Sequence, residues 1–543
     1  MEDGRARKTA LALGAGCLAL GASMVFVMRR RNKTPREPPV VRIPEKEAAD
    51  GVKNDQEDFL KRCRKMYGDI FTVNLEGGRR MTFVLDSRLI SGILNNTKTL
   101  SFTEVSKMAK ARFNVPSLLQ SPHDVKALSA LFRTAMQGAT LDAVLQSAQA
   151  RLTEHLDARL RLVGDGWHED ELWDLVSHVQ LGATVDAICG AGFFNSRVRD
   201  ALFSYDHTVG TRYDAASSSA GADVAGQRQA LLDAIEPRAL VQNGDGTVSQ
   251  VLVQLLQHAF GKGCDDVEAK NAVTVLLVGA VINTVPTSFY VLGHTAQDPA
   301  VVERLRVEAA TLLGTYDPAL PPSAQWSKPL GRKELAKAPF ADSLVRETLR
   351  FRGRSNSYRV VTKETLITHS NGQTYVFKPG MYVSICTRFA HHSPSIVHRP
   401  EVFNASRYMP HTGSATTATA ATKAAATAPA PASKAATAAS RSGREKGAQP
   451  AAAAAAAPPP LMPFGGGIGK CPGEAFVYNA LKSFVLRLLH CYDVEVVGGD
   501  LPPGNKGGIA SMPRPVGKAK VRLRRRPAAA AAAAVGGTGA GTQ

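Results

Sequence analysis

One cysteine stands at the junction between a glycine-rich segment and an expected helix. The run from Pro463 to Gly473 reads PFGGGIGKCPG, and a helix is expected to begin at Pro472, directly after Cys471. Three successive glycines allow the backbone to fold tightly beneath a flat macrocycle, where a Cβ atom would collide. Unpaired N–H groups and the dipole of a helix N-terminus stabilise a negative sulfur, so the thiol is expected to be deprotonated and a strong iron donor. The alternative is a structural glycine loop with an incidental buried cysteine.

The run from Phe464 to Gly473 fits F-x-x-G-x-x-x-C-x-G and resembles the haem-binding loop of the cytochrome P450 superfamily. The resemblance implies haem b as the cofactor, with Cys471 as the metal ligand and Phe464, Gly465 and Gly473 as cofactor-binding residues. Thiolate donation favours cleavage of the O–O bond. Gly469 departs from the usual pattern, because the superfamily commonly has Arg or His there to pair with a haem propionate. A non-basic residue is similar to the branch of sterol 7α-hydroxylases and prostacyclin synthase.

Other cations are therefore expected to bind the propionates. Lys470 is one alternative, and Arg359 lies where an arginine of the sterol 7α-hydroxylase branch meets a propionate. The alternative is that Arg359 is a solvated arginine at the end of a strand. Lys126 is a further cofactor-binding candidate, with His123 and Arg133 as alternatives in the same segment.

Glu347 and Arg350 are spaced one helical turn apart, which predicts an ion pair on one helix face. Such a pair alone is a weak signal, since most are solvated. Its place before the cysteine loop, with Arg407 between them, resembles the buried charge triad of the superfamily. The triad is expected to be structural and to hold the loop in place.

The segment 276–287 is an apolar helix with Asn283 and Thr284 in its middle. Pro286 lacks an N–H and so frees the carbonyl group of Ile282, which opens the helix. An incidental kink in a buried helix is the alternative. The pattern resembles the helix above the haem in sterol and oxysterol 7α-hydroxylases, although Tyr290 replaces their tryptophan. The resemblance makes Asn283 and Thr284 the catalytic residues, which direct protons during oxygen activation together with ordered water; asparagine itself cannot ionise.

Periodicity predicts a mainly α fold with small peripheral β-sheets, and the resemblance implies the cytochrome P450 fold as one large domain. Helices are expected over 59–67, 141–162 and 301–313, strands over 70–75 and 80–85, and reversals at Asn371-Gly372 and Pro379-Gly380.

The ends of the chain differ in composition from its body. Residues 10–28 carry no charge and are just long enough to span a bilayer as a helix, with Arg29, Arg30 and Arg31 following. The positive-inside rule then predicts a single-pass anchor with a cytosolic catalytic domain. The expected location of this anchor is the endoplasmic reticulum membrane. A cleaved signal peptide and a mitochondrial presequence are the rival readings. The expected organisation is a tail 1–9, an anchor 10–28, a basic Pro-rich hinge 29–45, a haem domain 46–526 with a low-complexity insertion 411–460, and a disordered Ala/Gly tail 527–543.

Composition limits the partners. The 543 residues carry a net charge of +19, which favours an acidic partner or anionic lipid. Nucleic acid is not expected as a partner, because the sequence has no basic patch interleaved with aromatic residues. The seven cysteines show no paired spacing, as in a reducing compartment. The adjacent His391 and His392 lack ligands at metal-binding spacing.

The resemblance thus implies a membrane-bound haem-thiolate monooxygenase acting on a sterol-like or fatty lipophilic substrate. Its expected partners are O2 and an NADPH-dependent flavin reductase that supplies electrons. The first rival is a redox-independent isomerase or dehydratase of lipid peroxides, similar to prostacyclin synthase. The second is a non-catalytic haem- or sterol-binding protein.

Overall fold

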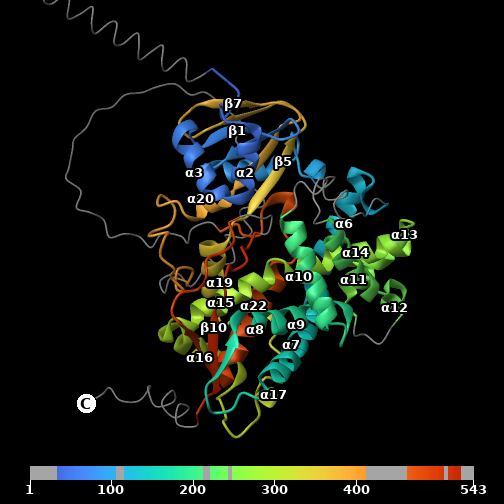
Figure 1. Cartoon of the computed structure of the whole chain (residues 1–543), viewed down its shortest axis with the longest axis vertical. Helices are drawn as coiled ribbons and strands as arrows, with labels where there is room; N and C mark the ends of the chain where they lie inside the picture. Colours follow the sequence, from blue (N-terminus) through green and yellow to red (C-terminus); the bar gives the residue numbers. More distant parts are fainter. Residues whose placement is uncertain are drawn as a thin grey trace, which may run out of the picture.

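The computed structural model describes residues 34–105, 115, 117–211, 221–242, 248–410, 461–506 and 511–527. Helices predominate among these residues, as the sequence predicted (Figure 1). The helices are α2 (Glu45–Asn54), α3 (Gln56–Tyr67), α4 (Ile90–Asn95), α6 (Pro122–Ala135), α7 (Gly138–Leu160), α8 (Leu172–Val176), α9 (Gly182–Cys189), α10 (Ser196–Thr211), α11 (Gly221–Ala234), α12 (Pro237–Gln242), α13 (Gln250–Gly261), α14 (Asp266–Val281), α15 (Thr284–Ala296), α16 (Pro299–Leu313), α17 (Pro322–Gln325), α18 (Arg332–Leu335), α19 (Pro339–Arg352), α20 (Thr387–His391) and α22 (Glu474–Cys491).

The strands form small sheets in the described part of the chain. The strands are β1 (Ile70–Leu75), β2 (Arg79–Val84), β3 (Leu100–Ser101), β4 (His168–Glu171), β5 (Asn356–Val361), β6 (Thr365–Thr368), β7 (Thr374–Phe377), β8 (Tyr382–Cys386), β9 (Tyr492–Val497) and β10 (Lys520–Arg525). The largest sheet has the order β1-β2-β8-β5-β3, with β2 and β8 parallel and the other pairs antiparallel. Figure 1 shows this sheet at one end of the long axis, beside α2 and α3, with most helices at the other end.

Local sequence signals explain several boundaries. Gly77 and Gly78 turn the β1–β2 hairpin with φ values of 75° and 69°, and Gly372 turns β6 into β7 with a φ of 87°. The side chain of Asp298 accepts the Ala300 N–H at the start of α16. The predicted elements at these places are confirmed, with ends shifted by one to three residues.

The described part of the predicted hinge lies against the sheets. The N–H of Val41 donates to the Thr72 carbonyl oxygen at 2.8 Å, and Glu37 forms an ion pair with Lys378 at 2.6 Å. These contacts attach residues 34–44 to β1 and β7. The sequence did not predict α2, which follows directly.

The helical core is centred on α15 and α22. Every residue of α15 is buried, and α22 contributes an almost unbroken buried run from Tyr478 to Cys491. Within the described residues, one helical stretch, Asp266–Ala296, is apolar and long enough to cross a membrane, but 67% of its most apolar window is buried in the protein. It is therefore a core helix of this fold.

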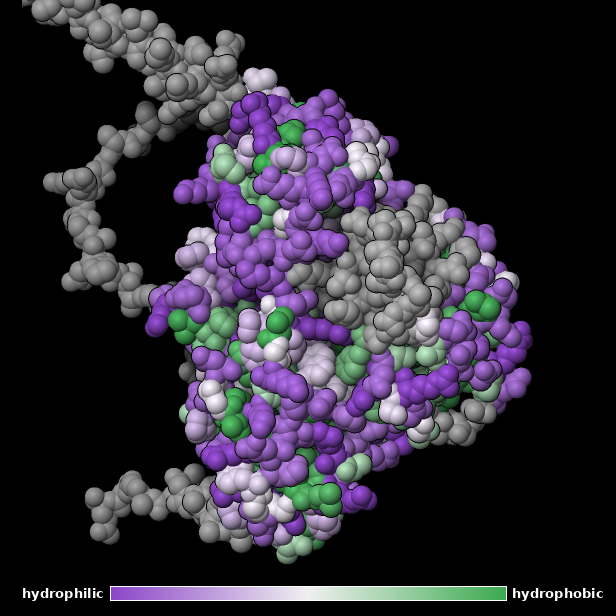
Figure 2. Space-filling model, viewed as in Figure 1, coloured by the Kyte–Doolittle hydropathy of each residue, from purple (hydrophilic) through white to green (hydrophobic). Residues whose placement is uncertain are grey.

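The surface shown in Figure 2 is mostly polar, as expected when the apolar residues are packed in the helical core. The face in Figure 2 is largely hydrophilic, and its hydrophobic residues lie in small separate patches. The predicted anchor 10–28, the insertion 411–460 and residues 528–543 of the predicted tail lie outside the described residues.

Candidate active site

The loop that carries Cys471 lies against helix α4. Gly465 and Gly467 have φ values of 70° and 61°, which residues with a side chain rarely adopt. A Cβ atom on Gly466 would lie 2.7 Å from Leu94 Cδ1, and one on Gly467 would overlap the Leu94 carbonyl oxygen. The sequence attributed these glycines to a flat ring, but the close approach of α4 already excludes side chains here.

The sulfur is positioned by the backbone on both sides of it. The N–H of Cys471 donates to the Phe464 carbonyl oxygen at 2.9 Å, which closes the loop. Helix α22 begins at Glu474 with Gly473 as its N-cap, two residues later than the expected start at Pro472. The difference arises because Pro472 and Gly473 form a turn.

The surroundings of Cys471 act on the pKa of its thiol in opposing directions. Burial by the surrounding protein raises the pKa of Cys471, and the Gly473 N–H and Lys470 lower it by less. The sulfur is nevertheless exposed on the surface of a cavity. Burial therefore opposes the effect of the helix terminus on this thiol.

The cavity has a volume of about 250 Å³ and is lined by both of the regions singled out in the sequence. Its wall brings together the cysteine loop, the break between α14 and α15, the start of β5 and the turn before β10. The lining residues used below are Phe102, Asn283, Thr284, Ser357, Arg359, Phe464, Gly465, Gly469, Cys471 and Met512.

Arg359 is a buried cation in this wall. It is 1% exposed, and its terminal nitrogens donate to backbone carbonyl oxygens of Tyr358 (2.8 Å), Leu94 (3.2 Å) and Gly466 (3.2 Å). Its Nε is buried and has no hydrogen-bond partner among the residues that the structure describes. Burial lowers the pKa of Arg359, and no carboxylate contributes to that pKa. An unpaired buried guanidinium beside a cavity is suited to an anionic group of a ligand.

The other candidate cations lie elsewhere. Lys470 forms an ion pair with Glu474 at 2.5 Å and does not line the cavity. Lys126 and His123 are exposed on α6, and Arg133 is half-buried on the same helix, outside the cavity wall. The structure therefore places Arg359, and none of these four, in the wall of the cavity.

Asn283 and Thr284 occupy the interruption between α14 and α15. The Thr284 hydroxyl donates to the Ala280 carbonyl oxygen at 2.6 Å, and the Asn283 side-chain oxygen accepts the Met512 N–H at 2.9 Å. The helix is broken at Ile282 and Asn283, as the sequence predicted from Pro286. The contact between Asn283 and Met512 was not predicted, because no local pattern links residues this far apart in the chain.

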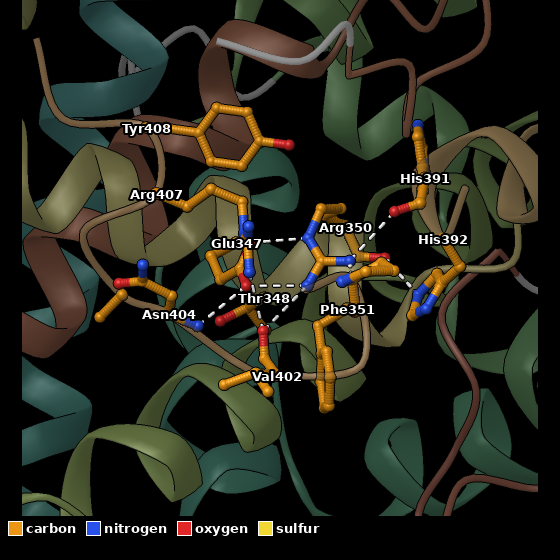
Figure 3. A network of polar contacts seen from close by, with 12 residues as sticks. Glu347, Thr348, Arg350, Phe351, His391, His392, Val402, Asn404, Arg407 and Tyr408 are labelled. Carbon is orange, nitrogen blue, oxygen red and sulfur yellow. Dashed lines mark hydrogen bonds and ion pairs between the residues drawn. The ribbon is translucent and has the colours of Figure 1, made fainter. Parts of the chain in front are cut away.

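Glu347, Arg350 and Arg407 form a closed charge network (Figure 3). Arg350 donates to the two carboxylate oxygens of Glu347 at 2.7 and 2.8 Å, and Arg407 Nε donates to one of them at 2.9 Å. The side chains of Glu347 and Arg350 are 0% exposed. The remaining donors and acceptors are satisfied by the backbone of His391, His398, Pro400, Val402 and Asn404.

His391 connects this network to the cysteine loop, which sequence reasoning missed. Its carbonyl oxygen accepts from Arg350 at 3.0 Å, and its Nε2 accepts the Met462 N–H at 3.1 Å. Burial, followed by Arg350 and Arg388, lowers the pKa of His391 to about 3. A neutral imidazole is required, since Nε2 must accept a hydrogen bond.

Comparisons with known proteins agree with this geometry. Mouse (Mus musculus) cytochrome P450 7B1 is 24% identical over 488 residues, covering 88% of each chain. Human (Homo sapiens) 7-alpha-hydroxycholest-4-en-3-one 12-alpha-hydroxylase is 25% identical and covers 90% of this chain and 93% of its own. Human prostacyclin synthase is 24% identical with the same coverage.

The fold is similar to that of a solved structure. Retinoic acid bound cyanobacterial CYP120A1 superposes with a TM-score of 0.64 and 18% identity, covering 91% of this chain and all of the other. The sequence model of the family described as cytochrome P450 matches residues 242–521. This chain therefore belongs to the cytochrome P450 family and is an oxidoreductase of the monooxygenase type.

Proposed function

We propose that this chain is a membrane-bound haem-thiolate monooxygenase that hydroxylates a sterol-like or fatty substrate with O2 and electrons derived from NADPH. Family membership supports the broader statement, a haem monooxygenase of lipophilic substrates. The observation that carries the proposal is that Cys471 lines the same cavity as Asn283 and Thr284. A thiol ligand and a polar pair on one cavity suit the binding and activation of oxygen between them.

The residues of the cavity fit a haem group. Cys471 offers a free thiol, and Arg359 offers a buried guanidinium that no carboxylate among the described residues neutralises. In the proposal, Cys471 binds the iron, Arg359 binds a propionate, and Phe464, Gly465 and Gly473 shape the surface around the sulfur. Bound there, haem supplies the redox chemistry that activates O2.

Thr284 and Asn283 are the proposed catalytic residues of this chain. The Thr284 hydroxyl donates its hydrogen bond to the Ala280 carbonyl oxygen. The hydroxyl oxygen therefore remains an acceptor that can orient water. Asn283 holds Met512, and with it the turn that lines the cavity. Neither side chain ionises, so protons must arrive through water that these groups position.

Arg359 and the charge triad are proposed to contribute to haem binding. Glu347, Arg350 and Arg407 hold the segment before the loop in place. The hydrogen bond from the Met462 N–H to His391 Nε2 connects that segment to the loop. Lys126 has no cavity contact to support a haem-binding role, so Arg359 is the cofactor-binding cation proposed here.

The remaining parts of the proposal concern attachment and electron supply. Residues 10–28 are proposed as a single-pass anchor in the endoplasmic reticulum membrane, followed by the hinge 29–45 and the haem domain 46–526 with its insertion 411–460. The electron donor is proposed to be an NADPH-dependent flavin reductase that docks on a basic surface, which the net charge of +19 supports.

An isomerase of lipid peroxides is the second candidate function. It is favoured by Asn283, which stands where a proton-donating acid would serve a hydroxylase, and by the similarity to human prostacyclin synthase. Such an enzyme needs no external electrons. Thr284 supports the hydroxylase, because an isomerase has no proton delivery for that hydroxyl to assist.

Turnover by the purified chain separates the two. Sterols and fatty acids are first screened for binding by the spin-state shift of the haem. The hydroxylase predicts a hydroxylated product only with reductase, NADPH and O2, and a several-fold loss of product per NADPH in Thr284→Val. Thr295→Val is the matched control, because Thr295 makes the same hydrogen bond to Val291 on α15 but does not line the cavity. Conversion of a lipid hydroperoxide without reductase, unaffected by Thr284→Val, would establish the isomerase instead.

A further inference from the structure

The side chain of Phe102 stands in the space next to Gly469. A Cβ atom on Gly469 would lie 3.0, 3.1 and 3.3 Å from three carbons of the Phe102 ring. These distances are shorter than ordinary carbon contacts, so any larger side chain at 469 must displace the ring. The backbone does not require glycine here, since Gly469 is absent from the residues with positive φ. The ring of Phe102 is thus the steric reason for glycine at this position.

The same ring covers Arg359. Strand β3 pairs with β5 so that Ser101 is opposite Val360; Phe102 directly follows β3, and Arg359 is the neighbour of Val360 on β5. The guanidinium carbon of Arg359 lies 5.3 Å from the ring centroid of Phe102, within the range of a cation–π contact. All three residues line the cavity that contains Cys471.

We propose that Phe102 is a positioning residue of the cofactor site and that Phe102 and Gly469 form a complementary pair, in which the ring takes the volume of a side chain at 469. The ring holds the guanidinium of Arg359 from one side, while the carbonyl oxygens of Leu94 and Gly466 hold it from another. These contacts fix the guanidinium of Arg359 in the wall of the cavity, where it can meet an anionic group. This inference rests on the proposed binding of haem in the cavity.

The pairing predicts coupled effects of substitution. Glycine at 469 is tied to an aromatic residue at 102, and a larger residue at 469 is tolerated only when residue 102 is small. Two independent sites would instead give additive effects.

A double-mutant cycle tests the pair. The variants are Gly469→Leu, Phe102→Ala and the two combined, and the measurement is the rate of haem loss from the full chain to an excess of apomyoglobin. Gly469→Leu is expected to accelerate haem loss by about tenfold or more, because the overlap must be relieved by moving the ring. The double variant is expected to lose haem within about threefold of the rate of Phe102→Ala alone.

A second glycine of the same loop provides the matched control. Gly466→Ala also introduces a clash, but with Leu94, so Phe102→Ala should not rescue it. If Gly469→Leu does not fold, the cycle is run with Gly469→Ala, whose single Cβ requires a shift of only a few tenths of an ångström. Additive effects in the cycle, or equal rescue of Gly466→Ala, would overturn the inference.

The inference and the proposed function fail in different ways. A wild-type chain that takes up no haem refutes the haem-binding function. The steric coupling between residues 102 and 469 involves protein atoms alone, and it is then read from the thermal unfolding of the haem-free variants, where additivity overturns the pairing. A chain that binds haem but shows additive effects refutes the pairing alone.

Discussion

The charge triad and the cavity wall hold their charged groups in opposite ways. Glu347 is contacted by two arginines and a backbone N–H, and the donors of Arg350 are likewise satisfied by protein atoms. Arg359 is as deeply buried, yet in the described part of the chain no carboxylate pairs with it and its Nε has no hydrogen-bond partner. A satisfied buried network stabilises one arrangement of the chain, whereas an unsatisfied buried cation marks a place where a ligand completes the structure.

The largest expected effect comes from breaking the closed network. Glu347→Gln leaves two buried arginines without their counter-charge, so the free energy of unfolding should fall by about 3–5 kcal/mol. Haem content after purification should fall with it, because the segment before the cysteine loop loses its order. Chemical denaturation and the ratio of haem to protein measure both quantities.

The matched control is the same substitution in an exposed pair. Glu495 forms an ion pair with Arg522 at 2.5 Å, with both side chains nearly half exposed. Glu495→Gln should cost no more than about 1 kcal/mol. Equal effects of the two substitutions would show that the triad is no more than a surface contact.

The next largest effect is expected from acid, which should lower the stability that His391 contributes beside the charge triad. The pKa of His391 is lowered to about 3 in the folded protein, below its ordinary value, so the unfolded chain binds a proton that the folded chain does not. Stability is therefore complete above the ordinary histidine pKa and is lost as the pH falls towards 3. The contribution of His391 between pH 7 and pH 5 is a loss of about 2 kcal/mol, measurable by denaturation at each pH.

His391→Gln isolates that contribution. Glutamine keeps an acceptor for the Met462 N–H and cannot be protonated in this range, so its unfolding free energy should depend less on pH than that of the wild type. An unchanged slope against pH would place the acid sensitivity elsewhere.

The smallest effect on protein stability is expected from substitution of Arg359 in the cavity wall. Arg359→Met removes three hydrogen bonds to backbone carbonyl oxygens but also removes the desolvation cost of a buried charge without a counter-charge. These two effects oppose each other, so the stability of the haem-free chain should change by no more than about 1 kcal/mol. Haem loss to apomyoglobin should nevertheless accelerate by about tenfold, since an anionic group loses its charged donor. A large loss of stability without haem would remove the contrast between the two regions.

The two regions also differ in how far the sequence revealed them. The spacing of Glu347 and Arg350 predicted the ion pair, because the helical repeat places such residues on one face. Asn371-Gly372 marked the hairpin turn for an equally local reason. These features depend on neighbours in the chain.

The cavity wall depends on distant residues, and there the sequence was less informative. The contacts of Asn283 with Met512 and of Phe102 with Arg359 join separate segments. The thiol of Cys471 was expected to ionise from its place before a helix, but desolvation, which is a property of the folded environment, outweighs that effect. Lys470 was one of the cations considered for the propionates, and the helical neighbour Glu474 binds it instead.

The central claim is that Cys471 binds a haem iron through its sulfur. The direct test is the absorption spectrum of the reduced protein with carbon monoxide, recorded for the wild type, Cys471→Ala and the control Cys264→Ala, whose cysteine is buried and does not line the cavity. The wild type and Cys264→Ala should show the thiolate-type band, and Cys471→Ala should lose it. An unchanged thiolate band in Cys471→Ala would contradict the claim.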